Sequence, residues 1–427
     1  MGLNVWSRAI AGKGMAALAD QTVASATNFL TGVIIGRACT KEQFGLYTLG
    51  FSIWLLVMSL QTSLIVTPYM VYSPRLSPAE HARYACSTLV HQLALSALAL
   101  CALALGGVAF SIGIGPRDLA PVAWTLAAVI PFILLREYIR QVSFATLRFK
   151  TALILDTGVS LVQIGGLLVL ARLGLVSAST AYWVVGMACG LAAVVWLVRQ
   201  RSTLALDPTR AIADLLHNWQ LGKWVFASGL LWALSMELYP WILAAFHGSA
   251  STGTWAACLG VAAIGNPLLL GMMSLVGPKM AHSYAQDGAM GLRRYVLKTC
   301  AVSSLVMAPF CVLLLVFGES VVVKLYGDKY AGNGLVVSAL AINLVVTSVA
   351  FSVSRALFAM ERADLDFAVS FVALAVLLTG GLWLVKSLGP LGAAFALLAG
   401  NTASSAVRYL VFARTIRRRS LTAYTLS

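Results

Sequence analysis

The sequence lacks most features of a soluble enzyme. Only 11% of its 427 residues are charged, whereas ordinary globular domains contain about 25%. It has no G-x-x-x-x-G-K-[ST] phosphate loop, no H-E-x-x-H and no G-x-S-x-G motif. These absences argue against a nucleotide-driven pump and a membrane hydrolase, and we expect no enzymatic activity.

Metal-binding and redox patterns are also missing. The five histidines are dispersed singly, and the seven cysteines show no C-x-x-C spacing. Most of the cysteines fall within apolar stretches, where they behave as small apolar residues. We therefore expect neither a metal site nor a cofactor.

Long apolar runs are what the sequence has instead, with 60% hydrophobic residues. A run of about 20 apolar residues forms a helix long enough to cross a hydrocarbon core of about 30 Å. The pattern predicts an all-α polytopic membrane protein with twelve transmembrane helices, near residues 15–36, 43–67, 84–113, 119–145, 151–171, 178–198, 222–246, 252–277, 295–317, 332–354, 366–385 and 389–412.

The basic residues fall mainly in alternate gaps between these stretches. Of the 30 lysines and arginines, 23 lie on the side of the N-terminus and 7 on the opposite side. Cytoplasmic loops carry the excess of Lys and Arg, so we expect a multi-pass membrane protein with both termini in the cytoplasm. Because the charge is divided among short loops, we expect no nucleic-acid partner.

The longest interruption divides the chain into halves. Asp207 and Pro208 suit a helix start, and an apolar face follows, so residues 201–221 are predicted to form a cytoplasmic amphipathic linker helix. Residues 1–200 and 222–427 then form two six-helix lobes. The interval from Gly45 to Pro68 corresponds to that from Gly253 to Pro278, which indicates a weak parallel repeat of the lobes.

Polar residues within apolar spans are the first candidates for function, because they are costly at membrane depth. Asp20 and Asn28 lie in the first span, and Glu237 lies in the seventh, three residues before Pro240. We consider Asp20 and Glu237 as ion-coupling groups and Asn28 as a substrate contact. A structural acid at Glu237 and a packing role for Asn28 are the alternatives.

Four arginines are candidates for substrate binding. Arg136 and Arg140 share a helix face by their i,i+4 spacing, and Arg355 ends the tenth span. Guanidinium groups bind phosphate oxygens bidentately, although these charges could equally serve only to orient the chain. Arg37 lies on the side that is poor in positive charge, where it either contacts substrate or extends toward the lipid headgroups.

Three segments resemble bacterial polysaccharide flippases. GRACTKEQFGLYTL (residues 36–49) is similar to the segment after their first span, NPLLLGMMSLVGPKMAHSYAQDG (266–288) to their eighth span and its exit, and LYGDKYAG (325–332) to their outer turn between spans nine and ten. On these segments the chain resembles the Wzx-type polysaccharide and O-antigen flippases of the multidrug/oligosaccharidyl-lipid/polysaccharide (MOP) exporter superfamily.

This resemblance implies a function and partners. It implies two six-helix bundles facing a cationic cavity, alternating access, and a polyprenyl-diphosphate oligosaccharide as the substrate, moved from the cytoplasmic to the outer face of the bacterial inner membrane. Membrane lipids and the polymerase and chain-length proteins of a glycan pathway are the other expected partners. A cation-coupled multidrug exporter of the same superfamily and a non-transporting scaffold of a glycan assembly complex are the alternatives.

Overall fold

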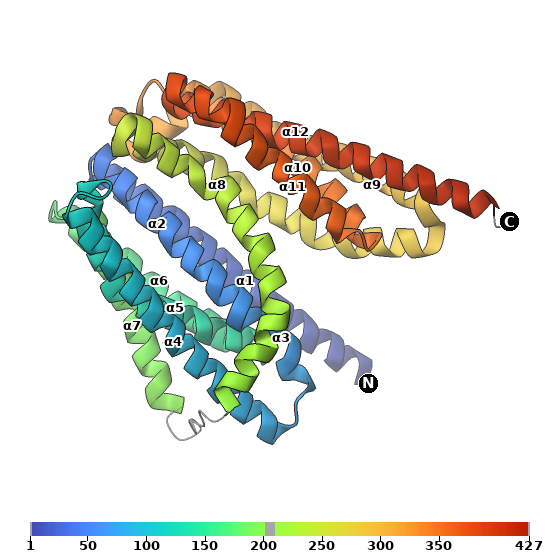
Figure 1. Cartoon of the computed structure of the whole chain (residues 1–427), viewed down its shortest axis with the longest axis horizontal. Coiled ribbons are helices and arrows are strands. Elements are labelled where there is room, and N and C mark those ends of the chain that lie inside the picture. The colour runs from blue at the N-terminus through green and yellow to red at the C-terminus, as the bar shows by residue number, and fades with distance from the viewer. Residues whose placement is uncertain (1, 201–209, 426–427) are drawn as a thin grey trace. The chain divides into compact units, whose positions relative to one another are not determined.

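The computed structural model describes residues 2–200 and 210–425, and these residues form helices joined by short connections (Figure 1). No strand occurs among them. The predicted all-α fold class is therefore confirmed.

The first part of the chain forms helices that mostly match single predicted spans. A π-helical turn, η1 (Thr62–Val66), joins the second helix to the short third one, and Pro78 begins the fourth helix behind a capping box formed by Ser77 and Glu80. The helices are α1 (Gly2–Ala38), α2 (Lys41–Gln61), α3 (Thr67–Tyr72), α4 (Pro78–Ser111), α5 (Ala120–Ala145), α6 (Phe149–Arg172) and α7 (Ala178–Gln200).

The second part of the chain contains longer helices. Another π-helical turn, η7 (Leu377–Gly381), connects the eleventh helix directly to the twelfth. The helices are α8 (Ala211–Ala262), α9 (Asn266–Tyr326), α10 (Gly334–Ala359), α11 (Ala363–Val376) and α12 (Leu382–Thr425).

Glycines bend the three longest helices. Gly248 in α8, Gly288 in α9 and Gly389 in α12 all have positive φ angles, which residues with a side chain rarely adopt. At the third bend Pro390 has no N–H to give to the carbonyl of Lys386. The His247 ring supplies one instead, because its Nε2 lies 3.1 Å from that oxygen.

These bends explain why one long helix can cover two predicted spans. Among the described residues, nine helical stretches are long and apolar enough to cross a membrane. The stretch 211–269 contains the predicted span 222–246 and most of the span 252–277, with Gly248 between them. The stretch 364–418 contains the spans 366–385 and 389–412, with Gly389 at the start of the second, and α1 covers the first predicted span. The architecture is therefore consistent with twelve crossings.

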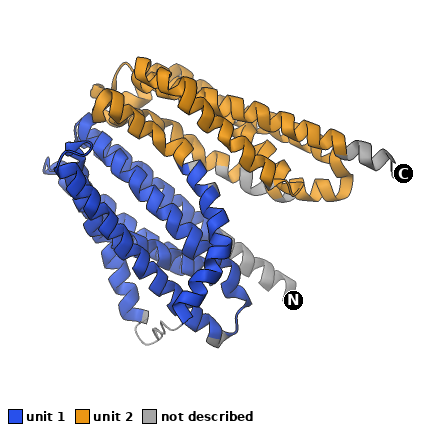
Figure 2. Ribbon diagram, viewed as in Figure 1, with its two compact units in different colours: residues 1–233 blue, residues 234–427 orange. Residues whose placement is uncertain are grey.

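The chain divides into two compact units, Met1–Ala233 and Leu234–Ser427 (Figure 2). The boundary falls inside α8. Residues 201–209 of the predicted linker helix lie outside the described residues, and α8 continues without a break through residues 211–221 into the next span. The predicted apolar face of this segment is exposed on α8, at Ile212, Leu215, Leu216 and Trp219.

Helix α5 forms the centre of the N-terminal unit. Leu126, Ile130 and Leu134 follow one another at intervals of four residues, and all three are fully buried. Helix α7 packs closely against α5, because a Cβ on Gly186 would lie only 2.4 Å from Cβ of Val129. Small residues let membrane helices approach in this way.

Candidate functional site

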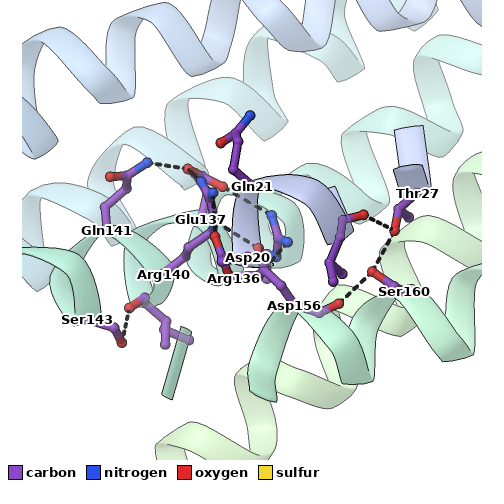
Figure 3. Close-up of polar contacts among 12 residues, drawn as sticks. Asp20, Gln21, Thr27, Arg136, Glu137, Arg140, Gln141, Ser143, Asp156 and Ser160 are labelled. Carbon is purple, nitrogen blue, oxygen red and sulfur yellow. Dashed lines mark hydrogen bonds and ion pairs between the residues drawn. The ribbon is translucent and has the colours of Figure 1, made fainter. Parts of the chain in front are cut away.

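Five charged side chains from three helices form a cluster in the N-terminal unit (Figure 3). Arg140 on α5 contacts Asp20 of α1 and Asp156 of α6, with Nη2 to Oδ2 and Nε to Oδ2 distances of 2.8 Å in both pairs. Arg136 contacts Asp156 at 2.6 Å between Nη2 and Oδ1. Glu137 completes the cluster at 3.1 Å from Arg136 and 3.3 Å from Arg140. The cluster therefore connects α1, α5 and α6.

Local sequence explains why these groups meet. Arg136 and Arg140 are one helical turn apart on α5 and face the same way. A tight turn with Leu147 at a φ of 57° then reverses the chain into α6, which brings Asp156 back alongside Arg136. The side chains of Asp20 and Asp156 have no exposed surface. Two buried carboxylates in an apolar protein require nearby cations, and the two arginines provide them.

A cavity of about 260 Å³ adjoins the cluster, with Arg136, Glu137 and Arg140 in its lining. Its size is near the lower end of the range of about 300–1,000 Å³ for small-molecule sites. One wall is polar and comes from α1, α5 and α6. Helix α2 contributes an aromatic and aliphatic wall made of Phe51, Trp54, Leu55 and Met58, and α7 adds Val185 and Cys189.

Hydrogen bonds between α1 and α6 hold the polar wall in place. Thr27 Oγ1 lies 2.7 Å from Ser160 Oγ, and Ser160 Oγ donates to the backbone carbonyl of Asp156 at 2.6 Å. Further along, Gln163 donates to Thr31 at 2.8 Å. Thr27, Ser160 and Gln163 all line the cavity. The wall therefore presents hydroxyl, amide, guanidinium and carboxylate groups in fixed positions.

A contact between two rings holds the aromatic side chains of the α2 wall in place. The rings of Phe51 and Trp54 meet edge to face with their centroids 5.3 Å apart. The indole Nε1 of Trp54 is buried and has no hydrogen-bond partner among the described residues. A buried donor without a partner is uncommon in folded proteins.

The structure brings four of the predicted site residues together. Arg136, Arg140 and Asn28 line the same cavity, and Asp20 contacts Arg140 directly behind it. The other three lie elsewhere. Arg37 is exposed at the far end of α1, and Glu237 on α8 and Arg355 at the end of α10 belong to the C-terminal unit.

Sequence reasoning missed Asp156, Gln163 and the apolar wall of α2. Asp156 could have been noticed in the sequence, because it is a lone carboxylate within an apolar span. That span directly follows the one that ends with Arg136 and Arg140, so a short turn can bring the charges together. Gln163 lies two turns further on the same helix.

Among the described residues, no group of three or more His, Cys, Asp or Glu side chains is arranged to hold a metal ion.

The cluster predicts a stability difference between two arginine variants. Arg140→Met should lower the free energy of unfolding by roughly 3 kcal/mol, because it leaves Asp20 and Asp156 buried with one cation in place of two. Arg362→Met is the control, since the Arg362–Asp364 pair is exposed. Thermal unfolding of the purified protein in detergent measures both. Equal midpoints for the two variants would show that the cluster contributes no particular stability.

Comparison with known proteins gives a family and a fold. A family model described as polysaccharide biosynthesis protein matches residues 79–333. No curated protein sequence matches the chain. Among solved structures, the inward-facing conformation of a multidrug resistance MATE family transporter of the MOP superfamily matches with a TM-score of 0.80 and 16% identity, over 95% of this chain and 99% of that one.

A second solved structure is a MOP superfamily transporter from Pyrococcus furiosus, for which reverse polarity of the binding pocket is said to suggest a different function. It matches with a TM-score of 0.63 and 15% identity over 94% of each chain. At such identities the likeness shows the fold alone. The family model covers more than half of the chain, so the chain belongs to the polysaccharide biosynthesis protein family and has the multi-pass fold of MOP superfamily transporters.

Proposed function

We propose that this protein moves a polyprenyl-diphosphate oligosaccharide from the cytoplasmic to the outer face of the inner membrane by alternating access. The family and the transporter fold support this proposal. The single observation that carries it is the cavity with one polar and one aromatic wall in the N-terminal unit. The excess of basic residues on one side supports cytoplasmic termini.

The two walls suit the two surfaces of a sugar ring. A pyranose presents a rim of hydroxyl groups and an apolar face of C–H bonds. Each hydroxyl that enters hydrocarbon without a partner costs about 1–3 kcal/mol, so unaided flipping of an oligosaccharide is prohibitive. In the cavity, Asn28, Ser160 and Gln163 can bind hydroxyls while Trp54 covers the apolar face. Arg136 and Arg140 contribute further donors to the same wall.

The diphosphate needs a different contact, because Arg136 and Arg140 are already paired with carboxylates. We assign it to Arg355, which is exposed and has no ion pair or hydrogen bond within the described part of the chain. Arg37, on the opposite side of the predicted membrane, is the candidate for release. Outward movement of two negative charges is favoured by roughly 4–5 kcal/mol at an inside-negative potential of about 100 mV.

Cation-coupled drug export is the second candidate function. An aromatic wall beside carboxylates also suits a lipophilic cation, and one of the two solved structures compared above is a multidrug resistance transporter. Hydroxyl and amide groups make up much of the polar wall, which favours the sugar. The two functions differ in the compound that crosses the membrane, so one reconstituted protein can be tested with both.

The aromatic wall predicts a transport defect. In proteoliposomes, Trp54→Ala should slow flipping of a fluorescent polyprenyl-diphosphate oligosaccharide by about tenfold or more, because a lost stacked ring is worth about 1–3 kcal/mol. Trp54→Phe should keep most of the rate. Trp183→Ala removes an exposed tryptophan from α7 and is the matched control. Export of lipophilic cations without any glycan flipping would favour the drug exporter instead.

The diphosphate assignment predicts a charge-dependent defect at Arg355. Arg355→Ala should slow flipping by about tenfold, since a charge-assisted contact to phosphate is worth about 1.5–3 kcal/mol. Arg355→Lys should recover part of the rate. Arg199→Ala, an exposed arginine at the end of α7, is the control. If Arg355→Ala flips at the wild-type rate with equal protein in the vesicles, the assignment is wrong.

Ion coupling through Asp20 and Glu237 is a separate proposal. Glu237 is a half-buried carboxylate within α8, where a proton or cation can neutralise it. With the membrane potential clamped, a pH gradient should accelerate flipping by the wild type and not by Glu237→Gln. Glycan flipping is measured over a range of external pH. A Glu237→Gln variant that follows the wild type at every pH excludes coupling at this residue.

A further inference from the structure

The charges around the cavity are not balanced. Three carboxylates, Asp20, Glu137 and Asp156, meet two guanidinium groups, those of Arg136 and Arg140. We infer that the cavity selects a glycan whose enclosed sugar carries no acidic group, and that Glu137 is the residue that sets this preference. The inference rests on the proposed function and deepens it, because it names the class of sugar.

The guanidinium groups are already engaged. Arg136 directs Nη1 to Glu137 and Nη2 to Asp156, at 3.1 and 2.6 Å. Arg140 directs Nη2 to Asp20, Nε to Asp156 and Nη1 to Glu137. An acidic group on a ligand must compete with these carboxylates for the same N–H donors. A neutral hydroxyl needs only one of the remaining donors and leaves the pairs intact.

The competing carboxylates cannot withdraw. Asp20 and Asp156 have no exposed side-chain surface, so neither can turn toward water if its arginine is taken by a ligand. Glu137 is only 10% exposed and is further fixed by Gln141, whose amide donates to it at 2.6 Å. A sugar acid would add a fourth negative charge next to two positive ones, in surroundings that screen charge poorly.

Glu137 has a particular position among the three acids. It is the carboxylate that lines the cavity, whereas Asp20 and Asp156 lie behind the wall. The wall residues Thr27, Asn28, Ser160 and Gln163 are uncharged hydrogen-bonding groups. Hence the charge of Glu137 is the one that a bound sugar meets directly, and its removal leaves two carboxylates against two guanidiniums.

A matched pair of substrates tests the inference. One is a fluorescent polyprenyl-diphosphate disaccharide that ends in glucose, and the other ends in glucuronic acid, so they differ only in a hydroxymethyl or carboxylate group. In proteoliposomes at a fixed potential, the wild type should flip the glucose form about tenfold faster or more. A form that ends in glucosamine, with a free amine, should flip at least as fast as the glucose form.

Variants then assign the preference to the cavity. Glu137→Gln should narrow the glucose-to-glucuronate ratio severalfold, and Asn28→Asp, which adds a charge to the same wall, should widen it. Glu137→Asp keeps the charge and should keep the preference. Asp118→Asn is the control, because Asp118 is exposed in the turn before α5, away from the cavity lining. Each ratio is measured within one protein, so it does not depend on the amount that folds.

The outcomes separate this inference from the proposed function. Flipping of both glycans at equal rates by the wild type overturns the inference and leaves the proposed function standing. An unchanged ratio in both Glu137→Gln and Asn28→Asp overturns the assignment to Glu137. If neither glycan flips faster than in protein-free vesicles, the proposed function fails and the inference fails with it.

Discussion

A charged side chain in an apolar interior must lie against an opposite charge, because an unpaired buried ion costs several kcal/mol. In the N-terminal unit this requirement determines how three helices are placed. Asp20 can reach Arg140 only if α1 lies beside the α5–α6 hairpin, and Asp156 can reach Arg136 only if that hairpin is closed. The hydrogen bonds of Thr27 with Ser160 extend the contact. The polar wall of the cavity is therefore a consequence of pairing these charges.

The apolar wall of the cavity comes from α2. Phe51, Trp54, Leu55 and Met58 form one face of α2 by their spacing, and such a face normally packs against apolar side chains. In this cavity it shares the lining with hydroxyl, amide and charged groups of α1, α5 and α6, which gain little from contact with it. A ligand with one polar and one apolar surface can contact both kinds of lining.

Much of the fold could be predicted from hydropathy, because a membrane leaves a chain few ways to satisfy its backbone. Hydropathy windows do not reveal the kinks at Gly248, Gly288 and Gly389, where the backbone angles are not helical and two helices meet. For the site, the cost of polar residues at membrane depth identified Asp20 and Asn28, and the i,i+4 spacing of two guanidinium groups identified Arg136 and Arg140. The structure brings these four residues together.

The rest of the site depended on pairing between helices, which one sequence does not reveal. Asp156 becomes significant only once the hairpin sets it 2.6 Å from Arg136. In the sequence, Trp54 is one of several apolar residues at helical spacing, and only the structure shows that it lines a cavity together with polar groups. In the C-terminal unit, Arg408 and Asp366 form a pair of one positive and one negative charge, with Nε and Oδ1 2.7 Å apart. A balanced pair has no residual charge to offer a ligand, whereas the unbalanced cluster beside the cavity does, so the proposed discrimination between sugars is assigned to the N-terminal unit.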